Sequence, residues 1–138
     1  MATYQAIVDQ IRTAANTALG GTGRFMHGRI VDASREANGE YPFIVLYPFT
    51  IRQGDGDNDS IDSTTILLGF WQQDGPDTTE VQREAIIAAM DTLSDLVLED
   101  LRDEMQISQV DKEPQYQFYQ GTLSGFAVRF SLQIMQSC

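Results

Sequence analysis

Two stretches of the chain repeat apolar residues at the three- and four-residue spacing of an amphipathic helix. The first covers residues 3–19 and stops at Gly20-Gly21, and the second covers residues 79–102 and can be capped by Asp77, Thr78 or Thr79. The apolar positions of the first helix are Tyr4, Ile7, Val8, Ile11, Ala14, Ala15 and Leu19. Those of the second are Ile86, Met90, Leu93, Val97 and Leu101, with Val81, Ala85 and Ala89 widening the stripe.

Other stretches show the patterns of β-strands. Residues 124–136 alternate apolar and polar side chains, as in a strand with one buried face. Residues 43–47 are apolar throughout, as in a strand buried on both faces, and residues 63–72 form a second strong strand. Shorter strands are expected at 24–31, at 105–110 and at 115–119, the last two on either side of residues 111–114.

The order of these elements predicts one α+β domain over residues 1–138. We expect a mainly antiparallel sheet with both helices on one face, because hairpins are frequent and crossover helices are scarce. Residues 41–72 would form a long hairpin, and its polar segment 54–60 would make an acidic tip.

The net charge of the chain excludes some classes of function. The formal net charge is −11, from 20 acidic and 9 basic residues. Such a surface repels phosphate backbones and anionic lipid, so we expect neither sequence-specific nucleic-acid binding nor membrane binding. The only cysteine is Cys138, which excludes an intramolecular disulfide. The start of the chain lacks the pattern of a signal peptide, which favours an intracellular protein.

Candidate catalytic and metal-binding motifs are incomplete. His27, the only histidine, has no carboxylate or cysteine at ligand spacing. Asp55, Asp57 and Asp59 are spaced like the first ligands of a calcium loop, but Ser60 and Ile66 occupy the positions that need Gly and Glu. Loose divalent-ion binding there stays open. We therefore predict no catalytic residue, no metal site and no cofactor.

Two groups of residues are candidates for contact with other proteins. The first group is aromatic and belongs either to the core or to a subunit interface: Tyr41, Phe43, Tyr47, Phe49 and Trp71. The second group is acidic and would face a partner or the lumen of a ring: Asp55, Asp57, Asp59, Asp62, Asp100, Asp103 and Glu104.

The order and lengths of these segments resemble those of bacteriophage tail terminator and related neck or tail-completion proteins. The features concerned are the helix from Tyr4 to Leu19, the strand Tyr41-Pro42-Phe43-Ile44-Val45-Leu46, the strand ending Gly69-Phe70-Trp71, the helix 79–102 and the alternating strand from Phe126 to Ile134. The resemblance covers nearly the whole chain but includes no diagnostic motif.

The resemblance implies a structural virion protein that is not an enzyme. Its subunits would assemble in the host cytoplasm into a ring, commonly a hexamer, in the tail or neck of the virion. The ring would end polymerisation of the tail tube and join tail to head, with the tube protein and a head–tail connector as partners and DNA passing through it. Terminator, stopper and sheath-stabilising roles stay open, as do an acidic binding module of inhibitor or immunity type and a small enzyme.

Overall fold

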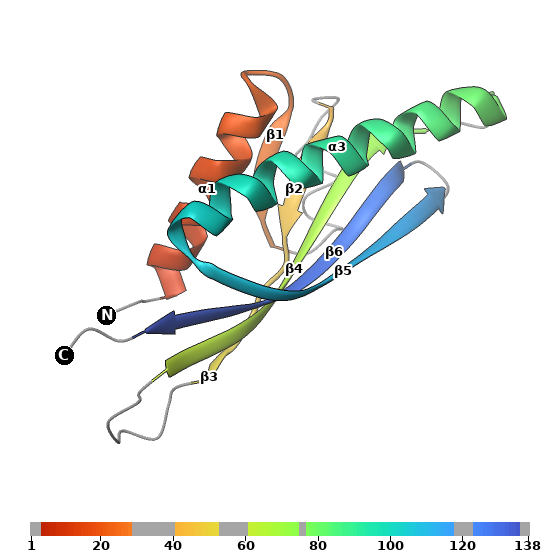
Figure 1. Cartoon of the computed structure of the whole chain (residues 1–138). Helices are drawn as coiled ribbons and strands as arrows, with labels where there is room; N and C mark the ends of the chain where they lie inside the picture. The colour runs from red at the N-terminus through yellow and green to blue at the C-terminus, as the bar shows by residue number, and fades with distance from the viewer. Residues whose placement is uncertain (1–3, 29–40, 53–60, 75–76, 118–122, 136–138) are drawn as a thin grey trace.

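The computed structural model describes residues 4–28, 41–52, 61–74, 77–117 and 123–135, and the statements below concern these residues. Their fold is a twisted sheet with two helices on one face (Figure 1). The strand order is β1-β2-β4-β6-β5, and the two-residue strand β3 also pairs with β4. All the pairs are antiparallel except β1 with β2, which is parallel. The predicted α+β class and the helices on a single face are confirmed.

The centre of the sheet is the pair β4 (Ile61–Gln73) and β6 (Leu123–Met135), which run side by side over 13 residues each. The alternation predicted for β6 is confirmed. Val128, Phe130 and Leu132 face the helices and are fully buried, whereas Arg129 and Gln133 on the other face are exposed.

The two helices are close to their predicted bounds. α1 (Tyr4–Leu19) ends where Gly20 takes a positive φ of 63°, which a residue without a Cβ adopts easily. α3 (Glu80–Glu104) begins with a capping box, in which Thr79 and Gln82 each satisfy a backbone N–H of the other. Both helices bury apolar side chains in one core with the sheet.

The predicted apolar stripe of the second helix is too wide. Met90, Val97 and Leu101 are buried, but Val81 is 75% exposed, and Ala85 and Ala89 are also exposed. Helical spacing alone does not show how wide a face the sheet covers.

The hairpin prediction is confirmed for its strands. β2 (Phe43–Leu46) and the short β3 (Ile51–Arg52) both pair antiparallel with β4. The proposed acidic tip lies outside the described residues. β1 (Arg24–His27), shorter than the predicted strand, joins the far edge of the sheet.

The two short strands predicted after α3 are one continuous strand, β5 (Gln106–Gln117). Its pairing with β6 shifts register between Ser108 and Asp111, and Gln109 there takes a positive φ of 54°. The sequence analysis predicted no strand at residues 111–114, which are polar and end in Pro114. They are tolerated because β5 is the edge strand of the described sheet, where a proline interrupts no second ladder.

The position of the Trp71 side chain depends on Gly69, two residues earlier in the same strand. Its indole is 1% exposed and lies over Gly69, whose missing Cβ would meet the Nε1 and Cε2 atoms of the ring. Gly69 therefore gives the indole room to lie against the sheet.

We predict that Gly69→Ala lowers the free energy of unfolding by about 1–3 kcal/mol, because the added Cβ must displace a buried ring. Trp71 is the only tryptophan, so its fluorescence spectrum should shift in the folded variant. Urea unfolding followed by fluorescence measures both effects. Thr65→Ala, at an exposed position of the same strand, is the control. A Gly69→Ala protein as stable as the parent, with unchanged emission, would contradict this placement of the indole.

Candidate functional site

The structure places two of the five aromatic candidates inside the core. Phe43 and Trp71 are 0% and 1% exposed, in a second cluster on the sheet face opposite the helices. Their burial within the subunit fits the core alternative of the sequence prediction and leaves neither ring exposed for an interface. The other members of this cluster are Met26, Val45 and Leu123.

Tyr41 and Tyr47 lie at the rim of the second cluster and are only partly buried. Burial raises the pKa of the Tyr47 hydroxyl above its ordinary value, and a hydrogen bond with Trp71 acts in the opposite sense. These two tyrosines therefore stay candidates for contact with another protein.

Phe49 belongs to a different aromatic group. Its ring stacks on that of Tyr4 with centroids 4.2 Å apart, and the Tyr4 hydroxyl is 2.9 Å from His27 Nε2. Partial burial and the nearby charge of Arg12 lower the pKa of His27. The group joins α1 to β1, so the only histidine has a structural partner.

The most strongly shifted carboxylate in the described chain is one that the sequence analysis did not select. Asp74 is 2% exposed and accepts hydrogen bonds from Arg83 Nε at 2.7 Å, Arg83 Nη2 at 3.3 Å and Ser124 Oγ at 2.5 Å. The bonds from Arg83 are the largest cause that lowers the pKa of Asp74 to about 2.

Asp74 holds three elements together. It follows the end of β4, Arg83 lies in the first turns of α3, and Ser124 lies at the start of β6. Bidentate hydrogen bonding to a guanidinium makes this buried charge tolerable. Its geometry is that of a structural anchor.

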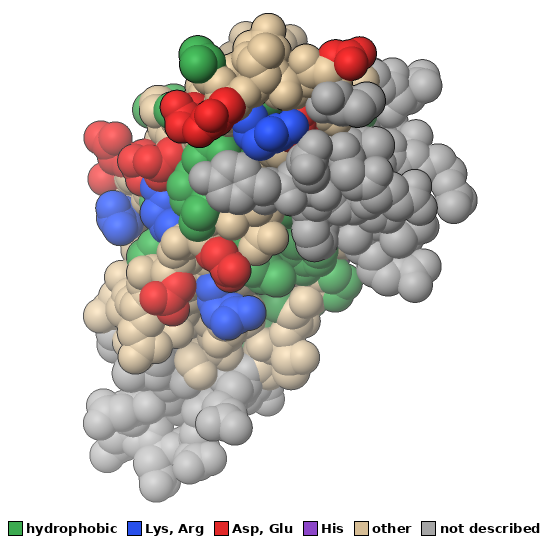
Figure 2. All heavy atoms as spheres, turned by 90° about the vertical axis from the view of Figure 1, so that its right-hand side faces the viewer, with side chains coloured by type: hydrophobic (Ala, Val, Ile, Leu, Met, Phe, Trp, Pro, Cys, Tyr) green, Lys and Arg blue, Asp and Glu red, His purple; other side chains and the backbone are tan. Residues whose placement is uncertain are grey.

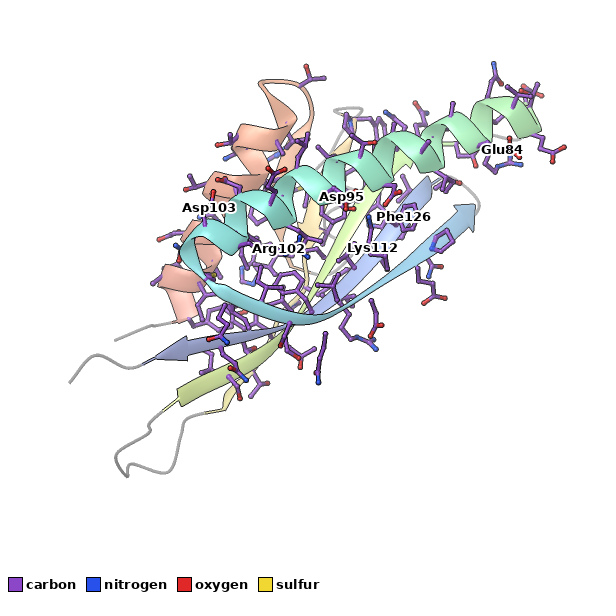
Figure 3. The ribbon with its side chains drawn as sticks, in the orientation of Figure 1. Glu84, Asp95, Arg102, Asp103, Lys112 and Phe126 are labelled. Carbon is purple, nitrogen blue, oxygen red and sulfur yellow. The ribbon has the colours of Figure 1, made fainter. Side chains whose placement is uncertain are left out.

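A second ion-pair group joins α3 to β5. The ammonium of Lys112, the only lysine, contacts the carboxylates of Asp91 and of Asp95, the latter at 2.8 Å (Figure 3). It also lies 5.5 Å from the centre of the Phe126 ring. Burial alone would lower the pKa of Lys112, but the hydrogen bonds to Asp91 and Asp95 outweigh it, and the pKa is raised.

The acidic candidates divide into those the structure places and those it does not. Asp100 and Asp103 both line a hollow of about 340 Å³ between α1 and α3. Asp62 and Glu104 lie at the start of β4 and the end of α3, but their side chains are not described. Asp55, Asp57 and Asp59 lie outside the described residues.

A larger hollow, of about 560 Å³, lies where β3, β4, β5 and β6 meet. Hydroxyl and amide side chains line it: Thr50, Ser63, Thr64, Thr65, Ser108, Gln109, Ser131 and Gln133. Ser131 donates a hydrogen bond to Gln109 Oε1 at 3.1 Å. No charged side chain lies among these lining residues, so the hollow offers hydrogen bonds but no acid or base for catalysis.

The surface in Figure 2 carries acidic side chains interspersed with basic and apolar ones, without one extended basic patch. Among the described residues, no group of His, Cys, Asp and Glu is arranged to hold a metal ion. No described helix is long and apolar enough to cross a membrane.

Comparisons with known proteins give no identification. No family model matches the chain, and a search of curated proteins finds no significant match.

We predict that the Asp74 anchor makes stability depend on pH in a defined window. The pKa of Asp74 is about 2 in the folded state against an ordinary 3.8, so its contribution is complete above pH 3.8 and is lost as pH falls toward 2. The shift corresponds to about 2 kcal/mol.

Asp74→Asn should lower the free energy of unfolding at pH 7 by about 2 kcal/mol, because the amide loses the charge-assisted hydrogen bonds from Arg83, and should flatten the pH dependence between pH 4 and 2. Urea unfolding at several pH values measures this. Asp9→Asn, which removes the exposed pair with Arg12, is the matched control and should change stability little. Equal losses in the two variants would contradict the anchor role.

Proposed function

We propose that this chain is a structural assembly protein of the tail-terminator type, which forms a ring with copies of itself. The ring would end a phage tail tube and join it to the head, with the tube protein and a head–tail connector as partners in the virion neck. The resemblance in order and length of the elements supports this proposal, as does an α+β fold with both helices on one face of the sheet.

The observation that carries the proposal is how the charges are distributed. Lys112, Arg83 and Arg12 each form ion pairs with aspartates, so these basic groups are largely neutralised within the subunit. The net charge of −11 leaves the surface acidic. An acidic sleeve repels DNA phosphates and lets DNA pass, whereas a basic sleeve would bind it.

Contacts between subunits would come from side-chain surfaces rather than from an exposed strand edge. β5 carries a register shift at Gln109 and a proline at Pro114, and both features discourage pairing with a further strand. Tyr41 and Tyr47, at the rim of the second cluster, are the aromatic candidates that remain for such a contact.

Catalysis has less support in the described residues. The groups with raised or lowered pKa, such as Asp74 and Lys112, hold elements of the fold together, and His27 is paired with Tyr4. The alternative of an acidic binding module is favoured by one observation, the hollow beside Asp100 and Asp103.

The ring is tested by the mass of the full chain in solution. Light scattering with native mass spectrometry should give a closed assembly of about six subunits of 15.4 kDa, either alone or after addition of tail-tube protein. Electron microscopy of the same sample should show rings.

Tyr47→Glu should shift this assembly toward monomers, because it places a charge in the proposed contact. Thr92→Glu, at an exposed position of α3, is the matched control and should leave the mass unchanged. A parent protein that stays a monomer or dimer at every salt concentration, and that ignores tube protein, would overturn the ring proposal.

A further inference from the structure

The groove between α1 and α3 combines an exposed leucine with small side chains. α3 contributes Leu96, which is 48% exposed. α1 contributes Ala14, Thr17 and Ala18, which are too small to fill the space opposite Leu96. The resulting hollow of about 340 Å³ has room for a few side chains of another molecule.

Three carboxylates line the same groove. Glu99, Asp100 and Asp103 come from the last turns of α3, and α1 contributes no basic side chain to the lining. Within the described chain none of the three forms an ion pair. Asp91 and Asp95, earlier on α3, are bound by Lys112. The groove therefore concentrates uncompensated negative charge beside an apolar floor.

The position of these acids on the helix is itself unfavourable. The C-terminal end of a helix carries partial negative charge, which cations stabilise and anions destabilise. Asp100 and Asp103 lie near that end of α3, where Figure 3 shows Asp103 beside α1. A bound cationic group would offset both the unfavourable interaction of these carboxylates with the helix end and their repulsion of one another.

We propose that this groove docks a basic segment of a partner protein that also carries apolar side chains. The apolar side chains would contact Leu96, Ala14 and Ala18, and Lys or Arg side chains would pair with Glu99, Asp100 and Asp103. Charge complementarity selects this occupant over any acidic surface, since the three carboxylates that line the groove repel further negative charge. It likewise disfavours a nucleic acid.

This proposal does not depend on the ring. The groove is complete within one subunit, so it can be tested on whatever oligomer the protein forms. Assembly is measured by mass and docking by binding, so either proposal can fail while the other stands.

The probe is a fluorescently labelled synthetic amphipathic helix of leucine and lysine residues, titrated with the full-length protein and followed by anisotropy at about 0.1 M salt. We expect saturable binding that weakens as salt is raised. Amide chemical shifts should change for Ala14, Ala18 and Leu96 rather than for the sheet.

Two variants test the two parts of the groove. Leu96→Gln and the double variant Asp100→Asn/Asp103→Asn should each weaken binding about tenfold, because the first removes the apolar contact and the second removes the counter-charges. The double variant should fold at least as stably as the parent, since it removes two anions from a helix C-terminus.

The matched controls lie at the other end of the same helix. Val81→Gln changes a more exposed apolar residue, and Glu80→Gln/Glu84→Gln removes the same amount of charge (Glu84 is labelled in Figure 3). Both should bind the peptide within about twofold of the parent.

Three results would overturn the proposal. The first is absence of binding, and the second is an equal loss in groove and control variants, which would mean attraction to net charge alone. The third is an assembly that dissociates in Leu96→Gln, since the groove would then be a contact between copies of this chain.

Discussion

The fold depends most on the antiparallel pairing of β4 with β6. These strands share 13 consecutive pairs of residues, and every second residue faces the helices. Phe70, Leu68 and Ile66 on one strand, with Val128, Phe130 and Leu132 on the other, make the surface on which α1 and α3 rest. A shift of one residue in this register would turn these side chains away from the helices and put polar ones in their place.

The same pairing divides the opposite face of the sheet into two regions. Near Trp71 and Phe43 it is apolar and buried, and Gly69 lets the indole lie flat. Near Ser63 and Ser131 it is lined by hydroxyl and amide groups and is hollowed. One face thus carries a second core and a polar surface, because the residues of both strands change character along their length.

The sequence predicts best where a pattern is long and local. The period-two alternation of β6 and the three- and four-residue spacing of α1 each extend over more than a dozen residues, and both elements were found. Position in the sheet is not a local property, so no strand was predicted at residues 111–114, although these polar residues belong to an edge strand.

Burial depends on the same nonlocal information. The apolar character of Phe43 and Trp71 fits both a core and an interface, and only the packing of the sheet separates the two. Asp74 was missed for a related reason. Its partners Arg83 and Ser124 are 9 and 50 residues away in the chain, and no sequence spacing connects them.

The acidic side chains described in the structure fall into two groups with different roles. Asp74, Asp91 and Asp95 are bound to basic groups, and they connect α3 to β4, β5 and β6. Glu99, Asp100 and Asp103 lie in the last two turns of α3, and a negative charge is least favourable at Asp103, nearest the helix end. General repulsion of DNA would need only a net negative surface, and it would be served by carboxylates placed anywhere on that surface. Their gathering beside Leu96 and a row of small side chains is a local feature, and net charge alone does not explain it. The docking of a basic segment accounts for the apolar floor and the carboxylates together.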